Sequence, residues 1–293
     1  MVRKRSKHRC CQTDCVRSGF TLIELLVVIA ILVLLIAILL PVLGRVKRQA
    51  RAVVCQSNLR QWGALWAEYV DEYNGQLPAW HWENPSEPGI HWGWGWWELG
   101  WGQDGTTDQF AAGRFCPMAK KHANPNVMWP QYGGTFLAWG PFRRKGVHPR
   151  VMYGSYGSNW WNHAWNGNPE TELYQRIWWT SHVRGTNNIP VQLDSTWPSA
   201  WGWGGGSWWA GTLKPPQCDA VPVASSVGQS FCINRHNGGI NSLFMDWSVR
   251  KVGLKELWTL KWHRNFDTNG PWTRGGGVKD EDWPVWMRKF KGY

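Results

Sequence analysis

The sequence contains few charged residues and no motif that is typical of an enzyme. Charged residues make up 18 % of the 293 residues and hydrophobic residues 43 %, a balance that excludes a disordered or collagen-like chain and predicts a buried core. The chain has no G-x-S-x-G or H-E-x-x-H motif and no phosphate-binding loop. Carboxylates that could cleave a glycosidic bond are present, but no spacing singles out a pair. We therefore expect neither catalysis nor a cofactor.

A nucleic-acid-binding pattern is also missing. Basic residues outnumber acidic ones by 32 to 20, which gives a net charge of +12. Six basic residues lie within the first 19, and the remainder has no stripe of Lys and Arg interleaved with aromatic residues. It has no helix-turn-helix, zinc-finger or RNP-like pattern either. The leader has a net charge of +5, and the remaining 274 residues carry only +7 without a binding pattern, so we expect no nucleic acid partner.

The longest apolar run, residues 20–40, predicts a membrane-spanning helix. It contains a single charge, Glu24, and a helix of this length rises by about 30 Å, the thickness of the hydrocarbon core. Basic residues before the run favour a cytoplasmic N-terminus. A cleaved secretory signal has a shorter apolar stretch, of about 7 to 15 residues. An ordinary anchor fits the length but leaves Glu24 without a partner for its charge.

The residues around this charge carry a family resemblance. Residues 19–28, G-F-T-L-I-E-L-L-V-V, follow a short basic leader and resemble the type IV prepilin signature, which pilins share with the pseudopilins of type II secretion systems. The resemblance implies that a prepilin peptidase cuts between Gly19 and Phe20 and methylates the new amine of Phe20. It also implies that Glu24 faces the N-terminal amine of a neighbouring pilin-like subunit, so that two charges costly in lipid offset one another. Pro41 matches the helix-kinking proline of many pilins.

Apolar residues continue at helical spacing beyond the membrane run. They form one face of an amphipathic helix, at Val46, Ala50, Val53, Val54, Trp62, Leu65, Trp66, Tyr69 and Tyr73. Asn74-Gly75 then predicts the end of the helix. We expect a leader at 1–19 that is removed, a transmembrane and spine helix at 20–73, and an extracytoplasmic head at 74–293. The expected fold class is α+β, with the helix packed on an antiparallel β-sheet head that has long Trp- and Gly-rich loops.

Two further segments resemble prepilin-like proteins that are abundant in Planctomycetes, Lentisphaerae and their relatives. Residues 55–62, C-Q-S-N-L-R-Q-W, are similar to the C-x-S-N-L-[KR]-Q helix of that group. Residues 236–246 are similar to its C-terminal H-x9-D-G element, with Trp247 in place of the glycine. The resemblance therefore reaches both ends of the chain and leaves residues 80–230 without a recognised motif.

The second of these segments predicts an antiparallel meander within residues 230–252. Apolar and polar side chains alternate there as in strands, at 231–234, 240–245 and 249–252. Trp247 disfavours a two-residue turn and favours a longer one that uses Ser248. We expect His236 and Asp246 to form a structural hydrogen bond between strands, and a metal or acid–base role for the pair is the alternative.

The cysteines suit an exported head. Three of the seven belong to the leader, which leaves four in the mature chain, namely Cys55, Cys116, Cys218 and Cys232. Four cysteines allow three connectivities, and we favour disulfides between Cys55 and Cys116 and between Cys218 and Cys232. Free buried thiols are the alternative. We expect no metal, because no C-x2-C pair exists and Cys218, Cys232 and His236 lack the spacing of a known closed zinc site.

Tryptophan is unusually frequent. The chain has 27 Trp, all from Trp62 onward, against 7 Tyr and 9 Phe, and many stand beside glycine. Exposed indoles can stack on sugar rings, which makes Trp94, Trp96 and Trp97 a candidate glycan platform. The alternative is that most of the indoles fill a core that is short of aliphatic residues.

Together these patterns predict a structural subunit of a type IV pilus or a type II secretion-like system. Its expected partners are the prepilin peptidase and methyltransferase, other pilin-like subunits and the lipid of the inner membrane. The expected location is the inner membrane, with a cytoplasmic N-terminus and a head in the periplasm or, after assembly, at the cell surface. The alternative is a membrane-anchored protein that binds or degrades surface glycans and uses the prepilin-like segment as a tether.

Overall fold

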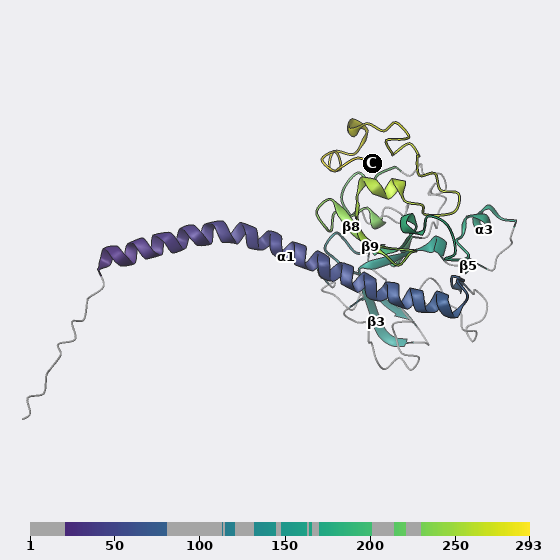
Figure 1. The fold of residues 1–293 in the computed structure, drawn as a ribbon, viewed down its shortest axis with the longest axis horizontal. Helices are drawn as coiled ribbons and strands as arrows, with labels where there is room; N and C mark the ends of the chain where they lie inside the picture. The colour runs from purple at the N-terminus through teal and green to yellow at the C-terminus, as the bar shows by residue number, and fades with distance from the viewer. Residues whose placement is uncertain are drawn as a thin grey trace, which may run out of the picture. The chain divides into compact units, whose positions relative to one another are not determined.

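The computed structural model describes residues 21–80, 113, 115–120, 132–144, 148–162, 164–165, 170–200, 214–220 and 230–293. The chain divides into two compact units, Met1–Lys47 and Arg48–Tyr293. Helix α1 (Leu22–Glu72) begins in the first unit and ends in the second, which also contains every described strand. The long helix α1 and the antiparallel sheets together confirm the predicted α+β class (Figure 1).

The part of α1 in the first unit presents apolar side chains to the outside. Aliphatic residues from Leu22 to Leu43 are exposed, Glu24 is the one charged residue among them, and the next charged residue is Arg45. Among the described residues, α1 is the one helix long and apolar enough to cross a membrane. Pro41 lies inside the helix, where its ring removes one backbone hydrogen bond, and the kink expected there stays a prediction.

The C-terminal end of α1 has the predicted cap. Asn74 and Gly75 both adopt left-handed backbone conformations, with φ of 54° and 80°, and the Gly75 N–H donates to the Val70 carbonyl at 2.6 Å. This pattern satisfies carbonyls that the last helical turn leaves without partners. A Cβ on Gly75 would collide with the ring of His182, so glycine is required by space as well as by φ.

In the second unit, one stripe of α1 enters the core. Its buried residues recur every three or four positions and are Cys55, Asn58, Leu59, Trp62, Gly63, Trp66 and Val70. The predicted face is correct for Trp62 and Trp66, and Leu65 and Tyr69 are half-buried, but the prediction is wrong for the exposed residues Ala50, Val53, Val54 and Tyr73. The buried stripe is centred on Cys55, Leu59 and Trp62, and successive helix residues point in different directions, so both valines lie outside it.

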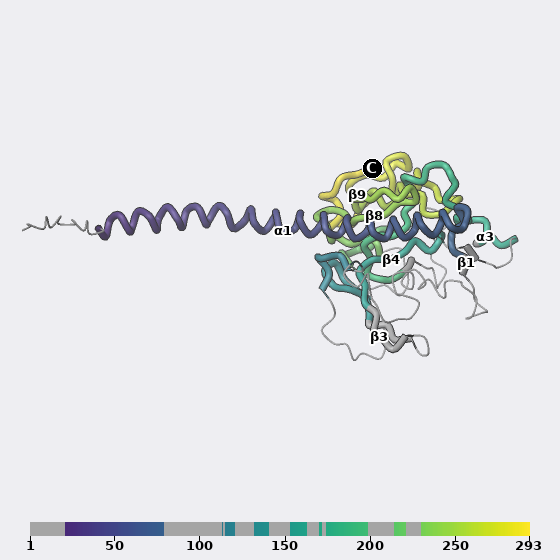
Figure 2. The backbone as a smooth tube through the Cα atoms, turned by 60° about the horizontal axis from the view of Figure 1, so that its bottom comes forward, coloured from purple at the N-terminus to yellow at the C-terminus, as the bar shows by residue number. Residues whose placement is uncertain are grey.

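A five-stranded sheet packs against this stripe, in the order β7-β4-β6-β8-β9. The strands are β4 (Tyr156–Asn159), β6 (Pro190–Asp194), β7 (Ser199–Ala200), β8 (Gly239–Phe244) and β9 (Val249–Gly253). All neighbours are antiparallel except β4 and β7. Figures 1 and 2 show the second half of α1 running beside the sheet, where Trp66 stacks on Trp247 with 6.3 Å between ring centroids.

Smaller elements surround the sheet. Two more pairs of strands are present, β2 (Trp139–Arg144) antiparallel to β3 (His148–Gly154), and β1 (Ala79–Trp80) parallel to β5 (Ala164–Trp165). The short helices are α3 (Glu172–Arg176) and the single-turn helices η3 (Trp160–Asn162), η4 (Thr186–Asn188), η7 (Lys255–Thr259) and η8 (Asp280–Asp282).

The predicted meander contains two of its three strands. β8 and β9 pair as expected, from Gly239 opposite Gly253 to Leu243 opposite Val249. Residues 231–234 are not a strand. The turn between β8 and β9 is longer than two residues, as Trp247 indicated: the Phe244 N–H donates to Ser248, and Trp247 takes a left-handed φ of 63°. Asp246 accepts hydrogen bonds from the Ser248 backbone and hydroxyl, which fixes this turn.

Tryptophans make up much of the core that the structure describes. Those with little exposure are Trp62, Trp66, Trp139, Trp160, Trp161, Trp178, Trp258, Trp262 and Trp283. Phe231 stacks on Trp262, and Trp258 meets Trp283 edge to face, as aromatic rings prefer. For the described residues, the indoles act as core filling.

Candidate functional site

The processing site predicted at Gly19 and Phe20 lies outside the described residues. The next residues are described and form a reciprocal cap at the start of α1. The Glu24 N–H donates to the Thr21 hydroxyl at 3.3 Å, and the Glu24 carboxylate accepts from the Thr21 N–H at 2.8 Å. It also accepts from the Thr21 hydroxyl at 2.7 Å. This is a capping box, in which two backbone N–H groups at the helix start are satisfied.

The capping box gives Glu24 a second role that sequence reasoning missed. The signal is present in the sequence as Thr21-x-x-Glu24 before an apolar run, a pattern that indicates a helix start. A carboxylate in the first turn also interacts favourably with the helix dipole. The charge of Glu24 therefore has a local structural use within one chain, beside the contact with a neighbouring subunit that the prepilin resemblance implies.

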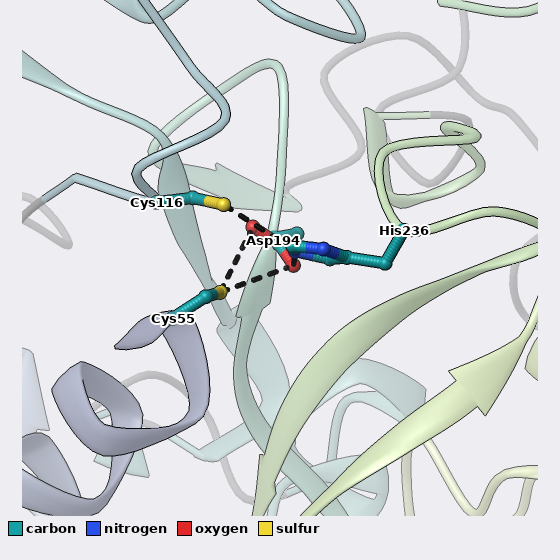
Figure 3. Close-up of side chains that lie close together, drawn as sticks. All are labelled: Cys55, Cys116, Asp194 and His236. Atoms are coloured by element: carbon teal, nitrogen blue, oxygen red, sulfur yellow. Dashed lines mark hydrogen bonds and ion pairs between the residues drawn. The ribbon is translucent and has the colours of Figure 1, made fainter. Parts of the chain in front are cut away.

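A second group of functional side chains lies deep in the head. Cys55, Cys116, Asp194 and His236 are all buried, and their ligating atoms lie within 4.8 Å of one another (Figure 3). We call these four residues the buried cluster. Figure 3 shows the four side chains pointing toward one another from separate parts of the chain. Cys55, Cys116 and His236 were each singled out from the sequence, whereas Asp194 was not.

Four elements position the cluster. Cys55 stands on the buried stripe of α1, and Asp194 is the last residue of β6. Cys116 is held by its backbone N–H, which donates to the Ser155 hydroxyl at 2.6 Å. His236 precedes β8 in a tight turn, where its N–H donates to the Gly239 carbonyl at 2.9 Å. The cluster therefore forms only when helix, sheet and two loops are in place.

Side chains of α1 hold the loop that carries Cys116. The Asn58 side-chain amide donates to the Phe115 carbonyl at 2.9 Å, and the Trp62 indole N–H donates to the Gly113 carbonyl at 3.0 Å. Buried backbone carbonyls need such partners, because an unsatisfied one is costly. Two residues of the helix stripe thus fix the backbone just before Cys116.

Asp194 is the most heavily contacted member of the cluster. One carboxylate oxygen accepts from Arg235 Nη1 at 3.0 Å, and the other lies 3.0 Å from His236 Nε2 and accepts from the Asn241 N–H at 2.9 Å. The Cys55 sulfur is 3.7 Å and 3.6 Å from the two oxygens. These contacts offset the cost of burying a carboxylate.

Arg235 holds the Asp194 carboxylate and the surrounding backbone in place. Its side chain is fully buried and donates to the carbonyls of Thr135, Ser155, Gly134 and Ser195 as well as to Asp194. A guanidinium has five N–H donors in a fixed plane, which matches this ring of acceptors. Sequence reasoning missed both Arg235 and Asp194. The only local signal for Asp194 is a carboxylate at the end of an apolar run, I-P-V-Q-L-D.

Charge in the cluster follows from these contacts. Burial alone would raise the pKa of Asp194, but His236 and Arg235 outweigh it and lower that pKa to about 2. Burial alone would lower the pKa of His236, but Asp194 raises it to about 9. Burial raises the pKa of the Cys116 thiol and that of Tyr156, whose hydroxyl lies 3.3 Å from the Cys55 sulfur. The Asp194 carboxylate and the His236 imidazole thus lie beside the Cys116 thiol, and Arg235 pairs with Asp194.

The pair expected between His236 and Asp246 is corrected by the structure. His236 contacts Asp194, while Asp246 is exposed and caps the β8–β9 turn through Ser248. The physical reason is the turn at residues 245–248, which makes Asp246 a turn residue instead of a strand neighbour of His236. His236 does pair with a carboxylate, but with that of Asp194 from β6.

The four cysteines of the expected mature chain are free thiols in the structure. Cys55 and Cys116, the first pair expected to bond, share the buried cluster. Cys232 is buried and Cys218 is exposed. The two disulfides are not formed here, and oxidation to either pairing stays a prediction. The candidate glycan platform of Trp94, Trp96 and Trp97 lies outside the described residues, and no finding supports glycan binding.

Comparison with known proteins identifies one region of the chain. Residues 16–40 match the family model of the prokaryotic N-terminal methylation motif. No curated protein and no solved structure matches the chain. The match confirms the prepilin-type resemblance of residues 19–28, whereas the resemblances of residues 55–62 and 236–246 stay predictions. The chain therefore carries a prepilin-type N-terminal methylation motif at the start of a helix that is apolar enough to span a membrane.

Proposed function

We propose that the chain is a pilin- or pseudopilin-like subunit that is cut after Gly19, methylated on Phe20 and assembled with other pilin-like subunits in a type IV pilus or a type II secretion-like system. The observation that carries this proposal is the match of residues 16–40 to the methylation motif, a match that includes most of the exposed apolar part of α1. In this proposal the inner membrane holds the helix before assembly, and the head lies in the periplasm. The role is structural and non-enzymatic.

Assembly in this proposal depends on the charge of Glu24. A carboxylate in lipid is costly unless it has a partner, and the freed amine of Phe20 on a neighbouring subunit provides one. The capping box offers a competing explanation for the same carboxylate, because Thr21 satisfies it within one chain. The two explanations differ in whether the negative charge itself is needed.

Glu24→Gln separates the two explanations. Glutamine keeps an acceptor oxygen for the Thr21 N–H, so the helix cap survives, but it removes the charge that would attract an ammonium group. The matched variant Thr21→Ala keeps the charge and removes the hydroxyl of the cap. We expect Glu24→Gln to be processed and inserted normally yet to lose incorporation into filaments, and Thr21→Ala to assemble.

Two measurements test the proposal. Mass spectrometry of the full chain, co-expressed with an active prepilin peptidase, should show a chain beginning at N-methylated Phe20, and Gly19→Leu should keep its leader. Crosslinking in membranes should show subunit contacts for wild type and not for Glu24→Gln. An intact N-terminus in the presence of active peptidase would refute processing. Equal crosslinking of wild type and Glu24→Gln would refute the assembly role and leave only the capping role.

A further inference from the structure

We propose that the buried cluster is a structural zinc site, in which Cys55, Cys116, Asp194 and His236 are the four ligands of one Zn²⁺ ion. The proposal is independent of pilin assembly, because it concerns the core of the head. It also departs from the sequence prediction of no metal, which considered His236 with Cys218 and Cys232. The cluster instead joins His236 to the other two cysteines of the expected mature chain.

The geometry fits a tetrahedral ion. With metal–ligand distances of about 2.0 to 2.3 Å, neighbouring ligand atoms lie about 3.3 to 3.8 Å apart. The Cys116 sulfur is 3.3 Å from His236 Nε2, and the Cys55 sulfur is 3.6 Å from the nearer Asp194 oxygen. His236 Nε2 and Asp194 are slightly closer, at 3.0 Å. All four atoms lie within 4.8 Å of one another, so small shifts suffice to place an ion between them.

The donor set selects the metal. Two sulfurs, one imidazole nitrogen and one carboxylate oxygen suit zinc, whereas calcium and magnesium prefer oxygen ligands only. Because four protein ligands complete the coordination and all four residues are buried, the site is of the closed, structural kind and leaves no position for a substrate.

Charge balance supports an ion at this position. On binding, each thiol releases a proton to solvent and the imidazole binds as the neutral form, without any change of oxidation state. The two thiolates and Asp194 then carry three negative charges, which the 2+ ion and Arg235 neutralise. Arg235 and the Asn241 N–H also hold the Asp194 carboxylate in place, as supporting hydrogen bonds do around metal ligands.

A Cys55–Cys116 disulfide is the principal competitor, because it uses the same two sulfurs. The two thiols contact one another, as a disulfide would require. The Cys55 sulfur also faces both oxygens of Asp194, and the Cys116 sulfur also faces His236, contacts that a disulfide does not need. The four side chains converge on one another as ligands do, and the structure has both thiols free. These contacts favour the ion.

The test uses the full chain purified in detergent with a thiol reductant. Elemental analysis after reconstitution with Zn²⁺ and removal of excess should give about one zinc per chain. Co²⁺ in place of zinc should produce the intense visible bands of a tetrahedral site and a thiolate-to-metal band in the near ultraviolet. Cys55→Ser and His236→Gln should each lose at least about tenfold in affinity for zinc, measured by competition with a chelator.

Control variants separate metal binding from folding. Cys232→Ser removes a buried thiol outside the cluster and should keep one zinc and an unchanged Co²⁺ spectrum. His236→Cys replaces one ligand by another and should keep the ion while shifting the Co²⁺ spectrum, which a variant that merely misfolds would not do. Circular dichroism and protease resistance report the fold of each variant.

Three results would overturn the proposal. The first is a chain that stays metal-free after incubation with excess Zn²⁺, although all four head cysteines are reduced. Their reaction with a thiol reagent after unfolding shows that they are reduced. The second is a Cys55–Cys116 disulfide, detected by peptide mapping of protein isolated without reductant, when reduction of that protein does not lead to zinc binding. The third is bound zinc whose amount and Co²⁺ spectrum are the same in wild type, Cys55→Ser and His236→Cys, which would place the ion elsewhere.

Discussion

Arg235→Met is expected to be the most destabilising single change in the head outside the cluster itself. The wild-type side chain makes five hydrogen bonds, four to backbone carbonyls and one to Asp194. Methionine fills similar space but donates to none of them. The buried Asp194 then loses one of its cationic partners, and the carbonyls lose theirs.

The magnitude follows from the burial of the ion pair. Both side chains are 0 % exposed, and removing one partner of a buried pair costs about 3–5 kcal/mol. Each carbonyl left without a donor adds about 1–3 kcal/mol to the loss of stability unless water reaches it. The ion pair alone therefore sets the lower bound of that loss. At about 2–4 °C per kcal/mol for a domain of this size, the melting temperature should fall by about 6–20 °C. Native proteins are stable by only about 5–15 kcal/mol, so the variant head would be marginal.

Urea unfolding of the full chain in detergent, followed by tryptophan fluorescence with EDTA present, measures the change. Arg250→Met is the matched control, because the Arg250 side chain pairs with Glu256 but is 38 % exposed, where solvent screening leaves about 0–1 kcal/mol. The urea concentration at which Arg235→Lys unfolds should lie between those of Arg235→Met and Arg250→Met, since an ammonium group keeps the charge but has fewer N–H donors than a guanidinium group. If Arg235→Met unfolds at the same urea concentration as Arg250→Met, the reasoning about the buried pair is wrong.

Two further predictions concern the sheet and the C-terminal segment. Gly157→Ala should destabilise the head by about 1–3 kcal/mol in the same urea assay, because a Cβ there collides with the backbone carbonyl of Trp197. A loss of stability below about 0.5 kcal/mol would show that the backbone moves to accommodate the Cβ. The hydrogen bond and charge of buried Lys255 lower the pKa of Asp280 below 3.8, so the pair stabilises the fold above that pH and the contribution is lost as the pH falls through the lowered value. The protection factors of amides near Asp280, which are exchange rates corrected for the intrinsic effect of pH, should therefore fall on acidification in wild type. Asp280→Asn should abolish that fall, and an identical fall in the variant contradicts the assignment.

Elements set by local pattern were predictable from the sequence. The apolar run and the Asn74-Gly75 cap give the ends of α1 to within two residues, because hydrophobic length and left-handed turn residues act locally. Strands β8 and β9 follow from alternation, and the longer turn between them follows from Trp247, a residue unsuited to a two-residue turn.

Features set by tertiary pairing were not predictable. Asp194 and Arg235 meet across 41 residues of sequence because β6 pairs with β8, and no local pattern reports which strands are neighbours. The buried stripe of α1 includes Cys55, which is only weakly hydrophobic, and Asn58, which is polar. A prediction based on hydropathy therefore placed Val53 and Val54 on the buried face instead. The pairing of His236 with Asp246 was wrong for the same reason: the topology of the sheet brings Asp194 to His236 instead.

The wide spacing of the buried cluster has a consequence for biogenesis. Cys55 and Asp194 are 139 residues apart, and Cys116 and His236 are 120 apart, so the core closes through contacts of high contact order, which slow folding. At about 5–20 residues per second, β6 leaves the ribosome on the order of 10 s after the helix. During that interval the indoles of α1 lack their sheet, and a nascent chain in this state is a natural client for a holding chaperone.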